Sequence, residues 1–261
     1  MENLPNLLQF DYSQFQSFFL ILVRLSGLFI SAPLISNPNI PRTIKAGLCI
    51  FLSLILFPFV DKSFLPVESS ISFFALIARE LSIGVFIGFF TSLIFVAIQL
   101  AGQYMDYQTG FGLVNIIDPQ SGAQVPLVGQ FLYLLATLLF LVIGGHHWII
   151  KSLVKSFEAF PLGSLTLDAN IVTVINDIFA KIIVLSFKIS APIVAAVFLI
   201  EMAYGVAARA LPQMNILIVG LPLKMGLGMF FLMLSLPFFL WIIKKEFINL
   251  FASIDNLFRF F

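Results

Sequence analysis

The residues of this sequence that could do chemistry are charged side chains within or beside long apolar runs. They are Arg24, Arg79, Glu80, Lys181, Lys188, Glu201, Arg209 and Lys224. A charge at the centre of a bilayer costs about 2.5–3.5 kcal/mol on insertion scales, so each group should pair or face a polar cavity. Two interpretations stay open: a relay for protons or ions, and salt bridges between helices with lysines that reach the membrane surface. Because Arg79 and Glu80 are neighbours, their side chains diverge on a helix and are expected to meet different partners.

The pair His146-His147 follows Gly144-Gly145 and raises the question of a metal site. Adjacent helical positions do not converge on one ion, and no cysteine cluster or HExxH spacing accompanies them. The sequence also has no P-loop, no GxSxG and no glycine pattern of a dinucleotide-binding fold. We therefore expect no metal, no cofactor and no enzyme activity. The net charge of +1 gives no sign of nucleic-acid binding.

A central stretch at residues 102–130 interrupts the apolar runs. It contains five glycines, two prolines, Asp106 and Asp118, and it has no Lys or Arg. A continuous helix through it is not expected, since glycine permits positive φ and proline removes a backbone donor. Residues 111–117 are nevertheless too apolar for an ordinary solvated loop. Non-helical backbone beside membrane spans must be buried by protein or line a cavity, so we expect one of these; a greasy surface loop is the alternative.

Composition predicts an all-α integral membrane protein. The chain has 261 residues, of which 60% are hydrophobic and 10% charged, and its mean hydropathy is +1.07. Globular chains carry about 25% charged residues. Several apolar runs reach the roughly 20 residues that a spanning helix needs. The six runs cover residues 18–35, 44–60, 71–100, 125–150, 171–204 and 216–243, with polar connectors expected at 36–43, 61–70 and 151–170.

The lengths and breakers of these runs argue against six straight spans. The run at 71–100 would be about 45 Å long as a straight helix, against a hydrocarbon core of about 30 Å. Most runs contain glycine or proline, so we expect kinked, closely packed helices that are stable mainly inside an assembly. Gly84 and Gly88 form a GxxxG motif, which lets two helix backbones approach closely. No polar stretch is long enough for a soluble domain, so a single membrane domain is expected.

The distribution of Lys and Arg predicts the side of the C-terminus. Connecting segments on that side hold Lys62, Lys151, Lys155, Lys244, Lys245 and Arg259, and the alternate segments hold Arg42, Lys45 and Arg209. Since cytoplasmic segments are enriched in Lys and Arg, the C-terminus is expected in the cytoplasm. The stretch MENLPNLLQFDYSQ at the N-terminus has no basic region and no clear cleavage site, so the first run is expected to be retained.

Five stretches of the sequence resemble the FliR family of flagellar type III export-gate proteins, whose injectisome counterparts are called SctT. They are APLIS…IPRTIKAGL (32–48), ARELSIGVFIG (78–88), AGQYMDYQTGFG…DP (101–119), GGHHWIIKSLVKSF (144–157) and RALPQMNILIVGLPLKMGLG (209–228). The last stretch is the most specific. Its family motif consists of Pro212, Gln213, Met214, Asn215, Gly220 and Pro222.

The resemblance implies a fold and an assembly. A FliP-like hairpin unit would cover residues 1–175, and a FliQ-like helix pair would cover residues 176–261, as part of a helical multi-subunit gate. This gate would belong to the flagellar basal body in the bacterial inner membrane, with its core raised toward the periplasm. The expected partners are FliP-like and FliQ-like gate subunits, an FlhB-like switch protein, an FlhA-like export protein and the unfolded flagellar proteins that leave the cytoplasm.

The resemblance also implies a pore plug in the central stretch. The plug would consist of Gly110, Phe111, Gly112, Leu113, Val114, Asn115, Ile116, Ile117, Asp118 and Pro119. In relatives, aromatic residues often lie toward the middle of this loop. Here Phe111 comes early, and Leu113, Ile116 and Ile117 supply bulk later. The sequence therefore does not identify which of these side chains closes the pore.

Two other classes of function remain as alternatives. A secondary transporter of a small solute would also have broken helices and buried charges near the midplane. Such a carrier should show two comparable halves, and the halves of this sequence differ in the positions of their breakers. A purely structural membrane scaffold is the third interpretation, and loss of the central stretch would not make the membrane leaky in that case.

Overall fold

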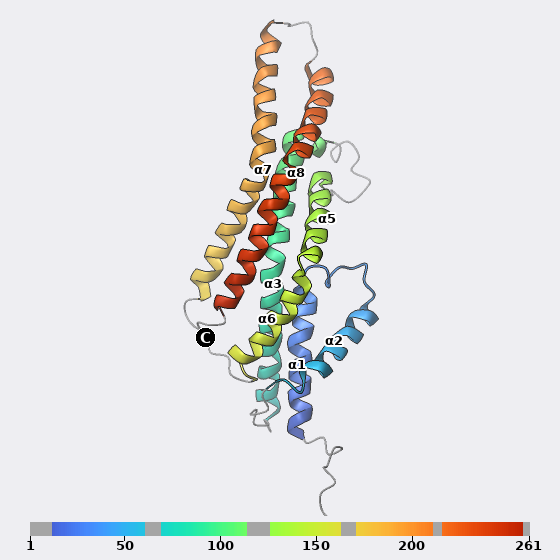
Figure 1. Cartoon of the computed structure of the whole chain (residues 1–261), viewed down its shortest axis with the longest axis vertical. Coiled ribbons are helices and arrows are strands. Elements are labelled where there is room, and N and C mark those ends of the chain that lie inside the picture. Colours follow the sequence, from blue (N-terminus) through green and yellow to red (C-terminus); the bar gives the residue numbers. More distant parts are fainter. Residues whose placement is uncertain (1–11, 61–68, 114–125, 163–170, 211–215, 258–261) are drawn as a thin grey trace, which may run out of the picture. The chain divides into compact units, whose positions relative to one another are not determined.

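The computed structural model describes residues 12–60, 69–113, 126–162, 171–210 and 216–257. These residues form seven α-helices and one 3₁₀ turn, labelled in Figure 1 where there is room. The helices are α1 (Tyr12–Ser31), α2 (Arg42–Leu56), α3 (Ser70–Thr109), α5 (Leu127–Val142), α6 (Gly145–Ala159), α7 (Ile171–Ala210) and α8 (Ile216–Leu257), and the turn is η1 (Phe111–Leu113). No strand occurs among the described residues, and the predicted all-α class is confirmed.

Among the described residues, four helices are long and apolar enough to cross a membrane, or five if the bent pair α5 and α6 counts as one span. The four candidate spans are Ser13–Ser31, Ser70–Thr109, Phe179–Arg209 and Val219–Ser253. The predicted run at 44–60 forms α2, which has only 15 residues. At 1.5 Å per residue such a helix is about 22 Å long, less than the roughly 30 Å hydrocarbon core.

The predicted interruption of the helices in the central stretch is confirmed, but it is shorter than expected. Helix α3 continues through residues 102–109 and has 40 residues, about 60 Å. Helix α5 then begins at Leu127, directly after Pro126. Pro126 lies directly before α5, and Gly102 is accommodated inside α3. The prediction that no continuous helix runs through residues 102–130 therefore holds, with the break beginning after Thr109 and ending before Leu127.

The apolar run predicted at 125–150 is not one helix. Helix α5 ends at Val142, and Gly144 has φ 73°, a left-handed conformation that glycine adopts without strain. Helix α6 then starts at Gly145 and extends to Ala159, so the connector predicted at 151–170 is helical in its first part. The helix breaks at this point because Gly144 adopts a φ that would strain a residue with a side chain.

The contacts of the chain divide into two compact units. Unit 1 consists of Met1–Ser92, Gly145–Asp168 and Leu250–Phe261, and unit 2 consists of Leu93–Gly144 and Ala169–Asn249. Helix α3 contributes its first part to unit 1 and its last part to unit 2. The division into a FliP-like part and a FliQ-like pair rests on the resemblance and stays a prediction.

Within unit 1, α1 and α3 pack with their backbones in direct contact. A Cβ added to Gly84 would collide with the backbone oxygen of Arg24, and one added to Gly88 would collide with Ser31. Gly27 meets α3 from the other side, where a Cβ would strike the backbone of Leu81. The Ser31 hydroxyl also donates to the carbonyl oxygen of Val85, at 2.9 Å. The structure thus places the GxxxG motif at the α1–α3 crossing, where only small residues fit.

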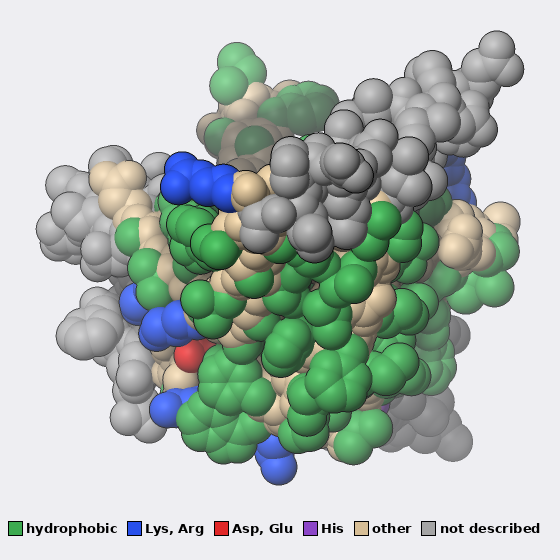
Figure 2. Space-filling model, turned by 90° about the horizontal axis from the view of Figure 1, so that it is seen from above, with side chains coloured by type: hydrophobic (Ala, Val, Ile, Leu, Met, Phe, Trp, Pro, Cys, Tyr) green, Lys and Arg blue, Asp and Glu red, His purple; other side chains and the backbone are tan. Residues whose placement is uncertain are grey.

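The outer surface is largely apolar. Figure 2 shows a face covered mostly by hydrophobic side chains, with isolated Lys and Arg side chains. In the apolar 18-residue stretch of each candidate span, 61% is buried in α3, against 39% in α7 and 28% in α8. Large exposed side chains on the last two helices include Phe187, Leu199, Phe230 and Trp241. Lipid or further protein must cover these helices, since water disfavours so much apolar surface.

Candidate functional site

The candidate site lies in unit 2, where the ends of α3 and α5 flank the segment that contains the predicted plug. Helix α3 ends at Thr109, and the next residue, Gly110, has φ 90° and donates its N–H to the carbonyl oxygen of Asp106 at 3.2 Å. The Thr109 hydroxyl donates back to the carbonyl oxygen of Met105 at 2.8 Å. Glycine in the left-handed conformation after the last turn is a common helix stop, so the sequence itself fixes where α3 ends.

The carboxylate of Asp106 binds the first turn of α5. The backbone N–H of Val128 donates to both carboxylate oxygens, at 3.1 and 3.2 Å, and the N–H of Gly129 donates to Oδ2 at 3.3 Å. Asp106 is only 4% exposed. A carboxylate is favourable here, because the first N–H groups of a helix have no partner inside the helix and the helix dipole favours negative charge there.

The two helices also meet backbone to backbone at the same point. A Cβ added to Gly102 on α3 would collide with the Cα of Gly129 on α5. Gly129 is buried, and a Cβ added there would press on the Pro126 ring. These glycines explain why α3 and α5 can come close enough for Asp106 to reach the N–H groups.

Helix α8 packs against the end of α3. The space beside Gly110 is bounded by the side chains of Leu221 and Met225, and the space beside Gly228 is bounded by Thr109. The start of the predicted plug therefore lies next to the helix that carries Gly220 and Pro222 of the family motif. Gly220 is buried and Pro222 is exposed on this helix.

A second polar group in unit 2 joins three helices. Glu201 on α7 forms an ion pair with Lys224 on α8, and its other carboxylate oxygen accepts from Nε2 of Gln108 on α3, at 2.9 Å. The two charged side chains are partly exposed, 17% for Lys224 and 40% for Glu201. Figure 1 shows α7 and α8 side by side, and this polar group links them.

A fully buried ion pair lies in unit 1. Nε of Arg24 donates to Oε2 of Glu80 at 2.6 Å, and both side chains are fully buried. The other guanidinium nitrogens donate to the carbonyl oxygens of Ser156 and Phe160, both at 2.9 Å, and to the Ser156 hydroxyl at 3.1 Å. The Phe157 ring lies 4.0 Å from the guanidinium carbon. This cluster ties α1, α3 and the end of α6 together and satisfies every charged group in it.

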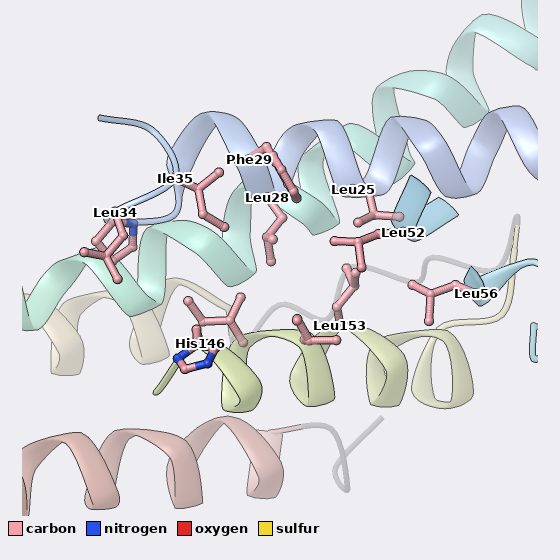
Figure 3. A pocket seen from close by; sticks show the side chains of 12 residues that line it. Leu25, Leu28, Phe29, Leu34, Ile35, Leu52, Leu56, His146 and Leu153 are labelled. Atoms are coloured by element: carbon pink, nitrogen blue, oxygen red, sulfur yellow. The ribbon is translucent and has the colours of Figure 1, made fainter. Parts of the chain in front are cut away.

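Unit 1 also encloses a cavity of about 80 Å³. Its walls come from α1, the turn after it, α2 and α6, and Figure 3 shows Leu28 and Leu153 directed into the same space. Apart from His146 the lining side chains are apolar. Leu34 on this wall has φ 71°, the one positive φ among the described non-glycine residues. The lining offers no set of groups that could perform a reaction.

The structure brings some predicted site residues together and leaves others apart. Arg24 pairs with Glu80, and Glu201 with Lys224, whereas Arg209 is an exposed residue in the last turn of α7. Several predicted residues lie outside the described residues, namely Val114, Asn115, Ile116, Ile117, Asp118, Pro119, Pro212, Gln213, Met214 and Asn215. Within the described part, no group of three or more His, Cys, Asp or Glu residues could hold a metal.

Two contributors to the site were missed as site residues from the sequence. Asp106 was noticed only as an acid in the central stretch, and Gln108 was not singled out. One signal for Asp106 was available in the sequence. Its stretch holds no Lys or Arg, so its carboxylate must accept hydrogen bonds from neutral groups such as backbone N–H. Pro126 was the second signal, since a helix that starts after proline has no local side chain to cap it.

These features define a helical membrane protein in which glycines allow close helix crossings and polar clusters join the helices. Residues 15–250 match the family described as bacterial export proteins, family 1. The chain is 33% identical to the flagellar biosynthetic protein FliR of Bacillus subtilis (strain 168) over 249 residues, which cover 93% of this chain and 95% of that protein. It is 31% identical to FliR of Aquifex aeolicus (strain VF5), with 82% and 83% covered, and 28% identical to FliR of Escherichia coli (strain K12), with 92% and 90% covered. The chain therefore belongs to the FliR family of flagellar export membrane proteins.

Proposed function

We propose that this chain forms, with FliP-like and FliQ-like subunits, the inner-membrane channel through which unfolded flagellar proteins leave the cytoplasm. The plug segment, defined as residues 110–119, closes this channel when it is idle. The observation that carries the proposal is the contact of Asp106 with Val128 and Gly129, which holds both ends of the intervening segment at one place. A segment with such a fixed base can occlude a pore without pulling the helices apart.

The composition of the plug segment suits a movable, water-excluding closure. Leu113, Val114, Ile116 and Ile117 supply apolar surface, which disfavours water in a narrow pore. Gly110 and Gly112 supply backbone freedom at its start. An export channel must pass an unfolded chain and still hold back ions, so an apolar seal on a flexible segment meets both needs.

The exposed faces of α7 and α8 support a place inside a multi-subunit assembly. Lys188 lies near the middle of α7 with its side chain exposed, beside the exposed Phe187. A lysine facing lipid at this depth is unfavourable, so a neighbouring subunit or a water-filled space is the better environment. FliP-like and FliQ-like helices would provide both, with the gate core raised toward the periplasm.

A deletion of residues 110–116 tests the plug. We expect ions and small solutes to cross the membrane in cells that express the whole export apparatus, while the assembly still forms. Deletion of seven residues at 62–68, in the connector between α2 and α3, is the matched control and should leave the membrane tight. If the plug deletion assembles and the membrane stays tight, the closure lies in another subunit and this function is wrong. Gly112→Val should slow export without a leak, since it stiffens the segment but keeps its apolar surface.

The C-terminal part of α8 is proposed to face the cytoplasm and to contact the FlhB-like switch protein and the FlhA-like export protein. The cluster Lys244-Lys245 at this end supports the side. Ser253→Cys should react with an impermeant maleimide only after the inner membrane is opened. The native Cys49 contributes little background, because it is buried on α2, outside the candidate spans, and burial raises the pKa of its thiol. Labelling of intact cells from the periplasm would contradict this orientation.

A further inference from the structure

Helix α5 begins without a local cap. The residue at its N-cap position is Pro126, with φ −63° and ψ 118°, and no side chain at that position accepts a hydrogen bond from the helix. The N–H groups of the second and third helical residues usually bond to an Asp, Asn, Ser or Thr at the N-cap. In α5 these residues are Val128 and Gly129, and both are buried. Unpaired, their N–H groups would make the start of α5 unfavourable.

The cap is supplied instead by Asp106, which lies 22 residues earlier in the chain, on α3. Both of its carboxylate oxygens accept N–H groups from the first turn of α5. An N-cap residue in the usual place would stabilise α5 alone. A cap that comes from α3 stabilises α5 only while the two helix ends are together.

We propose that Asp106 is a positioning residue that fixes the base of the plug segment by tethering the end of α3 to the start of α5. This inference rests on the proposed function, because it concerns the segment that those two ends enclose. The independent observation is the Gly102–Gly129 contact, where the two backbones touch and no side chain can intervene. The glycines permit the close approach of α3 and α5, and the Asp106 carboxylate holds the two helices together through hydrogen bonds.

The position of the tether relative to the plug follows from the chain. Asp106 is one turn before Gly110, whose N–H it also accepts through its backbone carbonyl oxygen. The same residue therefore closes the last turn of α3 and the first turn of α5. When the tether is lost, the end of α3 before the plug segment and the start of α5 after it are no longer joined, so the closed position of the segment is less populated.

The test must separate tethering from simple capping, and Pro126 makes this possible. Asp106→Ala removes both the tether and the cap. Pro126→Asp places a capping side chain at the usual N-cap position and removes the need for the remote carboxylate. In the double variant D106A/P126D, α5 is capped again but α3 and α5 are no longer joined. Pro126→Ser alone, with Asp106 retained, is the matched control, because a neutral capping side chain places no second carboxylate beside Asp106.

Ion leak in cells with the whole export apparatus is the first measurement. We expect D106A to leak at a level between that of the wild type and that of the 110–116 deletion, and D106A/P126D to leak as much as D106A. P126S alone should stay as tight as the wild type. A double variant that is as tight as the wild type would show that Asp106 is only a cap, and a tight D106A would show that it has no role in the closure. If the D106A chain does not assemble, Asp106→Asn gives the milder comparison, because its single amide oxygen accepts fewer of these N–H groups, and its leak should still exceed that of the wild type with or without P126D.

A second measurement does not depend on the plug being the seal. Spin labels at the exposed positions Tyr107 and Phe131, in a Cys49→Ser background, report whether the helix ends stay together in the purified assembly. We expect D106A to weaken the dipolar coupling between the labels and P126D not to restore it. Unchanged coupling in D106A would overturn the tether. A tight 110–116 deletion with weakened coupling in D106A would instead overturn the proposed function and keep the tether.

Discussion

Two ion pairs among the described residues each join a basic side chain to a glutamate, but their surroundings differ. In unit 1, Arg24 and Glu80 are both 0% exposed, and every side of the guanidinium has a partner. In unit 2, Lys224 and Glu201 are 17% and 40% exposed and have one further neutral partner, Gln108. The first pair, with its hydrogen bonds, joins three helices of one unit. The second can gain or lose partners without leaving a buried charge alone.

This difference shows which polar groups have all their partners within the chain and which are accessible to another subunit. A buried pair is costly to break, because the remaining charge is left in apolar surroundings, whereas an exposed pair contributes little. In unit 1, the buried Arg24–Glu80 cluster therefore has all its partners within the chain. In unit 2, Glu201 and Lys224 lie on α7 and α8, whose candidate spans are less buried than that of α3. We expect changes in unit 1 to affect the fold, and changes in unit 2 to affect assembly and export.

The largest effect is expected for Arg24→Ala. It leaves the Glu80 carboxylate buried without its partner, which typically costs about 3–5 kcal/mol. It also removes the donors from two carbonyl oxygens at the end of α6. We expect little full-length chain in the membrane, measured by quantitative immunoblotting of membrane fractions.

The double variant R24M/E80L is the control for this prediction. Replacing a buried ion pair by apolar residues of similar volume is often neutral, so it should recover part of the lost chain level. Full recovery is not expected, because the carbonyl oxygens of Ser156 and Phe160 still lose their donors. If R24A accumulates like the wild type, the pair does not hold unit 1 together.

An intermediate effect is expected for Gly84→Val at the α1–α3 crossing. The new side chain collides with the backbone of Arg24, so the helices must move apart, at a cost of about 1–3 kcal/mol. A lower melting temperature of the purified assembly is the measurement. Gly47→Ala on α2 is the matched control, since an added Cβ there meets nothing within 4 Å. Equal effects of the two changes would contradict the close crossing.

The smallest effect on stability is expected for Lys224→Met. The pair with Glu201 is partly exposed, and such pairs typically contribute about 0.2–1 kcal/mol. The level of the chain and its melting temperature should change little, while secretion of flagellar proteins falls if this polar group faces another subunit. A loss of the chain as large as in R24A would remove the contrast between the two pairs.

Much of the fold could be predicted from the sequence, because long apolar runs require helices in a membrane. The break in the central stretch followed from its glycines and prolines, although Gly102 proved to be helical. The turn at Gly144 was missed, since hydropathy alone did not separate α5 from α6. The short length of α2 was also missed, since apolar residues after its last turn extended the predicted run.

The partners of the charged residues could not be predicted. Arg24 and Glu80 are 56 residues apart, and sequence spacing within one helix says nothing about contacts between helices. The role of Asp106 was hidden for a related reason, because its partners are backbone N–H groups and every residue except proline has one. A long-range cap leaves no pattern of side-chain types, so only the folded chain reveals it.

The most direct test of the central claim asks whether the plug segment lies in the path of an exported protein. A photo-crosslinking amino acid is placed at Phe111, the partly exposed residue at its start, and a flagellar export substrate is stalled in the channel by a folded domain. The control position is Leu138 on α5, which is 59% exposed. The account predicts that the stalled substrate is captured at position 111 and not at position 138. Absence of capture at 111, with the substrate demonstrably stalled, would contradict it.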